Sequence, residues 1–552
     1  MTEGSARFAS RSEIAKHAGV RRPAVTNWER RHPDYPEPVL VEGAELFAVD
    51  AVAAWLSQRT IPANALNPDE RPGTTYGDRF RRSAGIHEKT EAPDRALSRR
   101  LATTLLGPLG EPWRHSGRES FYLELLLSLV LVRGCAPAAW SAAVYDLPDG
   151  RSPIRSLSRI RADVLGPEDD GWTGEGEGPV TRPEQWSLGR ACRLIDEVTG
   201  TSQAADLFGQ LLQSATERPG KRGEQLVTPP SLRQLMVGLA GEHPRPSVIH
   251  DPFCRSGELL VEFGGSRYER GSAVDLAVAE TPKERHRRIA AMNLMLHGVP
   301  FRTEIAPYLP SDHGRTGRAT YDLVLTNPPF SMKAPFDAPF VREEWPFGTP
   351  PERNADLGWI QHAVRSLNPA GRAIVVMANG AAFRGGRERE IRTRLLSAGA
   401  VEGVIALPPG LFSSTSIGVC LWLLRHPVEG PPPDVLFVDA REAGEMNTRT
   451  LRALTRTDVS ELVAEYRAWR RNPQDFTGTH SSRWSSSRAT FAEITEAEFS
   501  LDPARYARRS GTAIDAAAVT DRLQGIRGEL AHLHARASDV DQHVARLLDG
   551  MP

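Results

Sequence analysis

The stretch that decides the fold is Tyr321-Asp322-Leu323-Val324-Leu325-Thr326-Asn327-Pro328-Pro329-Phe330. Its apolar first part predicts a buried strand, and that strand runs directly into a rigid Pro-Pro turn. Two consecutive prolines remove two backbone donors and fix two φ angles, so the carbonyl groups of the turn remain as acceptors. Because α/β sheets bind ligands at the carboxyl ends of their strands, we expect this turn to line a ligand site.

The regions on either side of this turn predict the fold class. Between about residues 220 and 430, short apolar strands alternate with amphipathic helices, which is typical of an α/β domain with a mostly parallel, Rossmann-like sheet. The other expected strands are Ser247–His250, Ala373–Ala378, Val401–Leu407 and Val419–Leu424.

The acceptors in the Pro-Pro turn indicate a chemistry. An exocyclic amine carries two hydrogens, which the Asn327 side-chain oxygen and the Pro328 carbonyl can accept, so that the nitrogen lone pair faces a sulfonium methyl group. Phe330 offers a flat face to a base that has left the duplex. The expected catalytic residues are Asn327, Pro328, Pro329 and Phe330. Taken alone, the motif also suits glutamine side chains and RNA bases.

A second element precedes this turn in the sequence. The strand at Ser247–His250 is followed by Asp251-Pro252-Phe253-Cys254-Arg255-Ser256-Gly257 and then by a helix. A strand, a glycine turn and a helix let backbone N–H groups approach the amino-acid part of a cofactor. We expect Asp251 to take the ammonium group of that cofactor, directly or through water.

An acid at the end of the next strand commonly holds the two ribose hydroxyls of a nucleoside cofactor. Glu280 is the preferred residue, because Pro282 then opens the next helix, and Asp275 is the alternative. Glu304 lies where a further strand is expected to end, near the adenine.

From about Phe121 to Tyr506 the chain resembles the modification (methylase) subunit of type I restriction-modification systems, an N6-adenine DNA methyltransferase family. The segments that carry the resemblance are Phe121–Arg133, Asp206–Gly209, Gly223–Pro229, Ala290–Gly298, Asn327–Phe330, Gly371–Arg372, Val404–Phe412 and Leu501–Tyr506. The resemblance implies an S-adenosylmethionine-dependent methyltransferase sheet behind a helical bundle, adenine N6 in DNA as the acceptor, and a separate subunit that reads the bases. With the residues above, the expected cofactor-binding set is Thr228, Pro229, Asp251, Pro252, Gly257, Glu280 and Glu304.

The sequence departs from the family pattern in two places. Arg255 stands where the family usually has glycine, and its side chain either crowds the methionine part of the cofactor or turns outward. The family also does not generally begin with a helix-turn-helix. Two other functions therefore compete with DNA adenine methylation: a protein-glutamine or RNA methyltransferase, and a non-catalytic DNA-binding regulator that kept the fold.

The first 60 residues predict that helix-turn-helix. Ser12 is expected to cap a helix from Glu13 to Ala18, Gly19 to end it, and Pro23 to open a second helix. The shared core is expected to contain Ile14, Ala15, Ala18, Val20, Val25 and Trp28, and the segment from Phe47 to Leu56 resembles the closing part of winged-helix or excisionase-like modules. The residues expected to contact DNA are Arg21, Arg22, Thr26, Asn27 and Arg30; the alternative is a helical hairpin for protein contacts.

The expected domain order places further segments around the sheet. It runs from a helix-turn-helix (1–60) through a linker (61–95), a helical domain (96–217), the methyltransferase domain (218–440) and an extension (441–511) to a coiled-coil helix (512–552), with an acidic loop at Glu168–Gly178. The last helix carries a heptad seam made of Val519, Leu523, Ile526, Leu530, Leu533, Ala537, Val540, Val544 and Leu547. Such a seam predicts either self-association, a specificity-type partner subunit, or packing on the parent domain.

Composition restricts the remaining possibilities. A net charge of −1 and 25 % charged residues are ordinary for a globular protein, although arginine runs such as Arg285 to Arg288 suggest phosphate contacts. The four cysteines are far apart, which argues against a zinc site or disulfides, so we expect no bound metal. The absence of disulfides and of an apolar leader segment predicts a cytoplasmic protein.

Overall fold

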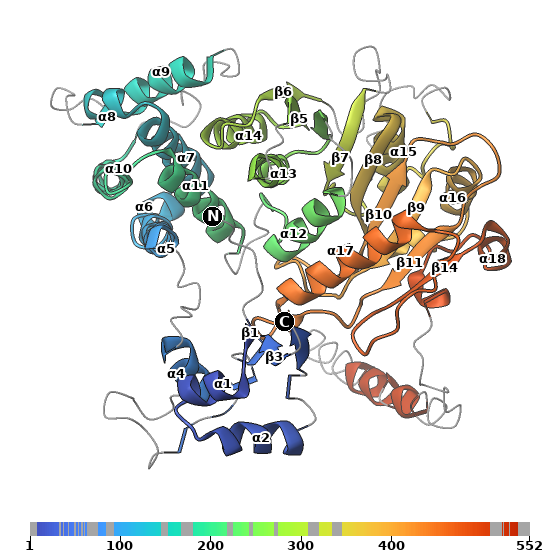
Figure 1. Cartoon of the computed structure of the whole chain (residues 1–552). Coiled ribbons are helices and arrows are strands. Elements are labelled where there is room, and N and C mark those ends of the chain that lie inside the picture. The colour runs from blue at the N-terminus through green and yellow to red at the C-terminus, as the bar shows by residue number, and fades with distance from the viewer. Residues whose placement is uncertain are drawn as a thin grey trace. The chain divides into compact units, whose positions relative to one another are not determined.

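The computed structural model describes residues 8–32, 35–36, 38–41, 44–48, 51–52, 55–56, 59, 61–62, 75–83, 93–144, 153–166, 180–217, 225–241, 247–269, 274–306, 320–333, 345–507, 522, 524–528 and 530–538. The expected acidic loop at Glu168–Gly178 lies outside these residues. The chain divides into two compact units, Met1–Leu97 and Ser98–Pro552 (Figure 1).

The small unit contains a helix-turn-helix and a sheet. Helix α1 (Arg11–Ala18) and helix α2 (Arg22–Arg31) are joined by a turn in which Gly19 has φ 66°. The expected cap at Ser12 is wrong: Ser10 caps α1, since its hydroxyl accepts from Glu13 and Glu13 bonds back to it, whereas the residue three after Ser12 is an alanine. Strands β1 (Phe8–Ala9), β3 (Ala44–Ala48) and β2 (Val39–Val41) form an antiparallel sheet in that order.

The core of the small unit has the expected composition and one further helix. Ile14, Ala15, Ala18 and Val25 are buried, and Val20 and Trp28 pack against them. The expected linker at 61–95 contains α4 (Tyr76–Ser83), whose Phe80 is buried in this core with its ring against His17. The linker prediction was therefore wrong for α4, because Tyr76 and Phe80 give this Pro- and Gly-rich stretch an aromatic face that packs on the core of the small unit.

The large unit is built on a nine-stranded sheet with the order β14-β11-β9-β10-β8-β7-β4-β5-β6. Strands β6 (Phe301–Ile305), β5 (Leu276–Thr281), β4 (Val248–Asp251), β7 (Tyr321–Thr326) and β8 (Leu367–Ala378) are parallel. Strand β10 (Val419–Arg425) lies antiparallel between β8 and β9 (Val401–Ala406), and β11 (Val435–Asp439) and β14 (Ser485–Ala489) complete the far edge. The sheet is mostly parallel, as expected, but it does not end at residue 440, because β14 comes from the expected extension.

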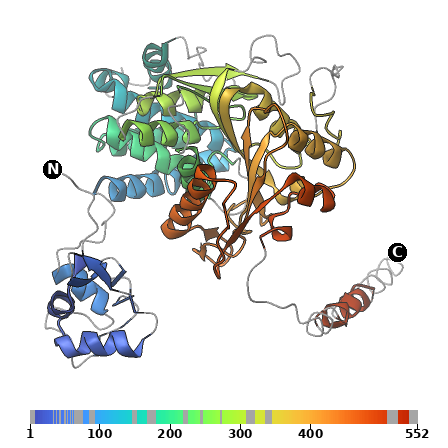
Figure 2. The ribbon, with the colours of Figure 1, turned by 45° about the vertical axis from the view of Figure 1, so that its right-hand side comes forward.

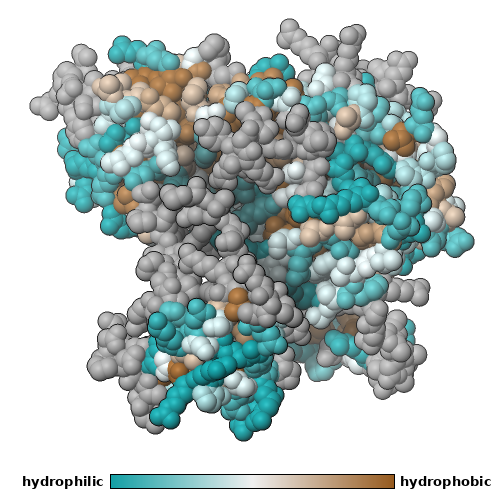
Figure 3. Space-filling view, in the orientation of Figure 1, coloured by the Kyte–Doolittle hydropathy of each residue, from teal (hydrophilic) through white to brown (hydrophobic). Residues whose placement is uncertain are grey.

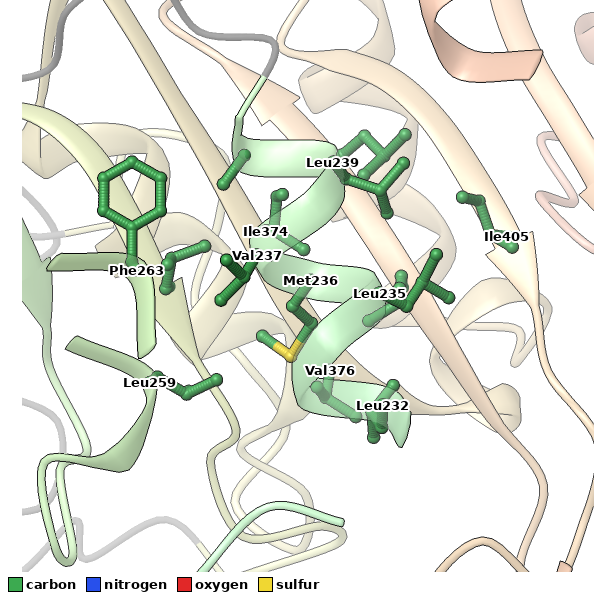
Figure 4. Packing of buried hydrophobic residues seen from close by; sticks show 14 of the residues in the cluster. Leu232, Leu235, Met236, Val237, Leu239, Leu259, Phe263, Ile374, Val376 and Ile405 are labelled. Atoms are coloured by element: carbon green, nitrogen blue, oxygen red, sulfur yellow. The ribbon is translucent and has the colours of Figure 1, made fainter. Parts of the chain in front are cut away.

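Two helical layers cover this sheet. One core contains side chains of α12 (Pro230–Ala240), α13 (Glu258–Glu269), α14 (Glu284–Leu296) and α17 (Arg456–Arg471), and the other those of α15 (Asp356–Ser366) and α16 (Arg387–Ser397). From Ala373 to Met377, successive residues of β8 alternate between the two cores, which is why this part of the strand is apolar throughout. Figure 4 shows α12 packed on Ile374 and Val376 of β8.

The segment before the sheet is helical. It comprises α5 (Pro93–Leu106), α6 (Glu111–His115), α7 (Glu119–Cys135), α8 (Pro137–Val144), α9 (Pro153–Leu165), α10 (Arg182–Ile195) and α11 (Thr201–Thr216). Helix α7 is buried almost throughout and packs on α11 and α14, so the helical segment lies beside the sheet's α14 side (Figure 2). Smaller elements are η5 (Asn379–Ala382), β12 (Glu445–Met446), β13 (Arg452–Ala453), α18 (Phe491–Glu496) and η6 (Pro503–Arg505).

An ion-pair network joins α7 to α14. Glu124 is buried, and its Oε1 lies 2.6 Å from Arg288 Nε; Arg287 pairs with Glu284 at 2.6 Å, and Arg285 donates to the Ser120 carbonyl at 3.3 Å. The expectation of phosphate contacts is not supported, because Arg285 and Arg288 bind α7 and Arg287 pairs with Glu284 within α14.

The described part of the C-terminal segment, 522–538 with gaps, is helical, and each of its described residues is exposed. Ile526, Leu530 and Leu533 of the expected seam are 46 %, 54 % and 59 % exposed. Val519, Leu523, Val540, Val544 and Leu547 lie outside the described residues.

Candidate active site

The two motifs of the sequence meet at one point of the sheet. Asp251 is the last residue of β4 and Asn327 follows β7, and these two strands are parallel neighbours. From β4 the chain continues to β5 and β6 on one side, whereas β7 leads to β8 on the other. This is the switch point at which α/β sheets open a crevice for a ligand.

The loop after β4 is held in a fixed shape by backbone contacts. The Phe253 N–H donates to Asp251 Oδ1 at 3.1 Å, and the Cys254 N–H donates to the Glu280 carbonyl at 2.7 Å. Gly257 has φ 73°, and a Cβ there would lie 3.3 Å from Leu294 Cγ. Only glycine fits this conformation without strain, and it lets the backbone turn directly into α13.

Helix α14 supports the same loop from behind. The Asn293 side-chain N–H donates to the Ser256 carbonyl at 2.7 Å, and Asn293 is buried. The resemblance marked this residue only as part of a matching helix, and its separation of 37 residues from Ser256 explains why no local pattern could reveal its role.

Glu280, the residue before the last of β5, is a buried carboxylate, 1 % exposed, and neither of its oxygens has a hydrogen-bond partner among the described residues. His250 Nε2 lies 3.3 Å from Oε1. Burial alone would raise the pKa of Glu280. The neighbouring His250, with a smaller contribution from His362, has the larger effect, so the pKa of Glu280 is lowered. A buried charged acceptor whose one near donor is His250, among the described residues, has acceptor capacity left for a pair of ligand hydroxyl groups.

The other two acids lie at different places. Glu304 is the cross-strand neighbour of Glu280 on β6 and pairs with Arg302 at 2.6 Å. Asp275 precedes β5, at the amino end, where its N–H donates to the Ser247 carbonyl at 2.9 Å. Glu280 therefore lies near the carboxyl end of β5, where α/β sheets bind ligands, whereas the alternative Asp275 lies at the opposite end of the strand.

Asp251 is buried at the carboxyl end of β4. Desolvation by burial, with a smaller contribution from the charge of Glu258, raises its pKa to about 7. A ligand cation next to this carboxylate would replace lost hydration and favour the charged form. The neighbouring Pro252 is buried in the same turn.

A hydrogen-bond relay sets the orientation of the Asn327 side chain. Its Nδ2 donates to Thr228 Oγ1 at 3.2 Å, and Thr228 donates its own hydroxyl and backbone N–H to Glu258 Oε1, each at 2.9 Å. Because Nδ2 is committed to Thr228, the Asn327 oxygen must face the opposite way. Glu258 was not among the predicted site residues, although it is adjacent to the predicted Gly257.

Glu258 is itself fixed by the cofactor loop. The Ser256 hydroxyl lies 2.8 Å from Glu258 Oε2 and 2.8 Å from the Leu226 carbonyl. The relay therefore ties the segment before α12, which contains Thr228 and Pro229, to the loop after β4 and to the catalytic turn.

The catalytic turn is anchored beyond its prolines. Phe330 is half-buried with its ring edge-on to Phe412, 5.7 Å away. Ser331 adopts φ 51°, and its N–H donates at 2.7 Å to Oδ1 of the buried Asp356, the first residue of α15. Arg384 holds the other oxygen of Asp356 at 3.0 Å. This anchor keeps a strained residue directly after the motif.

A cavity of about 240 Å³ lies beside the site. Pro229 and Phe412 line it, together with the amide side chains of Gln213, Gln225, Gln234 and Asn447. Since Phe412 also contacts Phe330, this cavity adjoins the catalytic turn.

In the small unit, four of the five residues expected to contact DNA lie on α2 and Arg21 is its N-cap. Arg21, Arg22, Thr26 and Arg30 are exposed and Asn27 is half-exposed. Four of them line a shallow groove with Pro23 and Ala24: Arg22, Thr26, Asn27 and Arg30. Figure 3 shows a predominantly hydrophilic surface over this helix.

Two kinds of feature do not occur in the described part of the chain. It contains no group of three or more His, Cys, Asp or Glu side chains that could hold a metal ion. Among the same residues, no helix has both the length and the apolar character needed to cross a membrane.

Comparisons with known proteins agree with this geometry. Residues 201–513, more than half of the chain, match the model of the family described as N-6 DNA Methylase. The chain is 27 % identical over 368 residues to the type I restriction enzyme HindI methylase subunit of Haemophilus influenzae, covering 63 % of this chain and 79 % of that one. It is 29 % identical over 320 residues to the MjaIX methylase subunit of Methanocaldococcus jannaschii, covering 54 % and 55 % of the two chains.

Solved structures share the fold. The methyltransferase subunit of a type I restriction-modification system from Streptococcus thermophilus superposes with a TM-score of 0.55 at 19 % identity, over 75 % of this chain and 98 % of that one. A structure from a study of complex assembly in a type I system gives 0.56 at 18 % identity, over 84 % and 99 %. The expected family is confirmed: the chain belongs to the N-6 DNA methylase family and is an adenine-specific, S-adenosylmethionine-dependent DNA methyltransferase.

Proposed function

We propose that this chain is the modification subunit of a type I restriction-modification system, and that Asn327, Pro328, Pro329 and Phe330 carry the methylation of adenine N6 in DNA. The observation that carries the proposal is the relay from Asn327 through Thr228 to Glu258. It presents an acceptor at the carboxyl end of β7, beside the loop that suits a nucleoside cofactor.

The residues of the crevice fit S-adenosylmethionine. The orphaned oxygens of Glu280 suit the ribose hydroxyls, Asp251 suits the ammonium group, and the Gly257 turn admits the backbone to the methionine part. When bound, this cofactor supplies an electrophilic methyl group. Glu304, at the edge of the same region, lies on the side assigned to the adenine of the cofactor. Thr228 and Pro229 are assigned to the wall of the cofactor site.

The catalytic turn holds and orients the acceptor amine. The Asn327 oxygen and the Pro328 carbonyl each accept one N–H of adenine N6, which leaves the nitrogen lone pair directed at the methyl group. Transfer would break the sulfonium–methyl bond as the C–N bond forms, and the two oxygens would stabilise the positive charge on the nitrogen until its proton passes to water. Phe330, fixed against Phe412, stacks on the extruded base.

Two further segments support a role in a DNA-bound complex. The exposed arginines of α2 provide a DNA-binding face in the small unit. The exposed heptad residues Ile526, Leu530 and Leu533 provide an apolar stripe for a partner helix of a specificity-type subunit or of a second copy. A full-length chain that remains monomeric beside its candidate subunit, and is unchanged by deletion of 512–552, would count against this assignment.

The deciding experiment measures cofactor binding and methyl transfer separately. The full chain, alone and with its specificity-type subunit, is titrated with S-adenosylmethionine, and transfer of labelled methyl groups to duplex DNA is followed beside Asn327→Ala. We expect binding in both proteins and transfer to adenine in the unsubstituted protein only. Failure to bind the cofactor would support a non-catalytic regulator, and transfer to protein or RNA instead of DNA would change the substrate.

A further inference from the structure

Arg255 connects the cofactor loop to the catalytic turn. Its Nη1 donates to the main-chain carbonyl of Asn327 at 2.9 Å, across 72 residues of sequence. The guanidinium carbon also lies 4.9 Å from the centre of the Phe253 ring, so the side chain is held between an aromatic face on its own loop and a carbonyl on the neighbouring loop.

This contact acts on the geometry of the catalytic turn. The proline ring fixes φ of Pro328, so the direction of the Pro328 carbonyl depends on ψ of Asn327 and on ψ of Pro328 itself. A donor that fixes the Asn327 carbonyl fixes ψ of Asn327. Arg255 thereby restricts the orientation of the second acceptor, although it lies outside the motif.

Asn327 is then held from two sides. Thr228 binds the side-chain amide and orients the first acceptor, whereas Arg255 binds the backbone and orients the second. The buried Asn293 fixes the carbonyl of Ser256, the residue next to Arg255. The backbone at Arg255 is therefore held against α14 by this hydrogen bond.

We propose that Arg255 is a positioning residue for methyl transfer, which holds the Asn327–Pro328 peptide so that both acceptors face the target amine. The proposal rests on the function proposed above for Asn327. It differs from both expectations for an arginine in this loop, because the side chain neither turns outward into solvent nor acts mainly on the cofactor.

The test compares kcat with cofactor affinity. Arg255→Met keeps a long unbranched stem but has no donor, Arg255→Lys keeps a charged donor, and Arg389→Met is the control, since Arg389 is a half-exposed surface residue of α16 paired with Glu498. Each full-length variant, with its specificity-type subunit, is assayed for kcat on duplex DNA. Its Kd for S-adenosylhomocysteine is measured by calorimetry.

We expect Arg255→Met to lower kcat about ten- to a hundredfold, as loss of a charged donor predicts, with the Kd changed less than about threefold. Arg255→Lys should recover part of kcat, and Arg389→Met should match the unsubstituted protein. An unchanged kcat in Arg255→Met overturns the proposal. So does a parallel loss of cofactor affinity, which would make Arg255 a cofactor ligand, or a gain of affinity in Arg255→Gly, which would make it an obstruction.

Thermal melting separates these results from misfolding. If Arg255→Met melts early, Arg255→Leu, which also lacks a donor, takes its place, and a kcat equal to that of the unsubstituted protein overturns the inference. Transfer that persists in Asn327→Ala would instead refute the proposed function and leave the Arg255 contact as a structural one.

Discussion

The side-chain nitrogen of Asn327 lies 3.2 Å from the hydroxyl oxygen of Thr228, and this contact fixes which way the Asn327 amide is turned. An amide has its donor and its acceptor on opposite sides. Thr228 can accept from Asn327 because it donates its own hydrogen to Glu258 at 2.9 Å. The order of donors in this relay leaves the Asn327 oxygen as the group presented to an amine.

Replacing Thr228 tests this relay. Thr228→Val keeps the shape of the side chain but removes the hydroxyl, so the amide loses its orienting partner, and we expect kcat to fall about five- to tenfold, as for one neutral hydrogen bond. The Kd for S-adenosylmethionine should remain within about threefold, because Val keeps the shape that Thr228 gives to the wall of the site and only the hydroxyl is lost. Thr228→Ser is the matched control and should retain most of kcat. Equal kcat values for the Val and Ser variants would show that the relay does not orient Asn327.

Glu280 is expected to carry the ribose contact. Glu280→Gln removes the charge and one acceptor, and we expect the Kd for S-adenosylhomocysteine to rise about ten- to a hundredfold, since hydrogen bonds to charged groups contribute about 1.5–3 kcal/mol. Glu304→Gln, at the neighbouring position on β6, should have a smaller effect because Glu304 is partly exposed. Calorimetry with both variants checks this, and a larger loss in Glu304→Gln would exchange the two assignments.

Cofactor affinity should depend on pH through Asp251. Burial raises the pKa of Asp251 to about 7, so below that pH the carboxyl is mostly protonated and cannot pair with an ammonium group. We expect the Kd to increase as pH falls below about 7, approaching tenfold per pH unit, and to level off above it. Titrations between pH 5.5 and 8.5 measure this, with Asp251→Asn as the comparison. The Asn variant should bind weakly and lose the pH dependence; retention of the same slope would place the titrating group elsewhere.

The sequence predicted those parts of the site that depend on local pattern. The strand at Tyr321–Thr326, the turn at Asn327 and the glycine at 257 each follow from spacing within about ten residues, and the structure places them as expected. Arg255, Asn293 and Glu258 act through partners 72, 37 and 30 residues away. Which side chains meet there depends on the sheet topology, which no local pattern contains.

Packing between α7 and α11 predicts that substitutions at two glycines change the free energy of unfolding by very different amounts. A Cβ at Gly134 would lie 2.6 Å from Ala204 Cβ, whereas a Cβ at Gly209, an exposed position in α11, would meet nothing within 4 Å. We expect Gly134→Val to lower the free energy of unfolding by about 1–3 kcal/mol or more, because the helices must separate. Gly209→Ala should be neutral or raise it by up to about 1 kcal/mol. Urea denaturation followed by circular dichroism measures both values, and equal stability of the two variants would contradict the close approach.

The arginines of α2 are expected to bind DNA through phosphates. Arg22 and Arg30 are exposed, lie eight positions apart and therefore share roughly one face of the helix. Replacing both by alanine should weaken DNA binding and reduce the slope of log K against log salt by about 2, one for each lost phosphate contact. The Kd for S-adenosylmethionine should not change, because neither arginine belongs to the cofactor crevice.

Fluorescence anisotropy on labelled duplex DNA at several salt concentrations measures the slope, with Lys16→Ala on α1 as a control of equal charge type. An unchanged slope in the double variant would assign this helix to protein contacts, the alternative that its sequence left open.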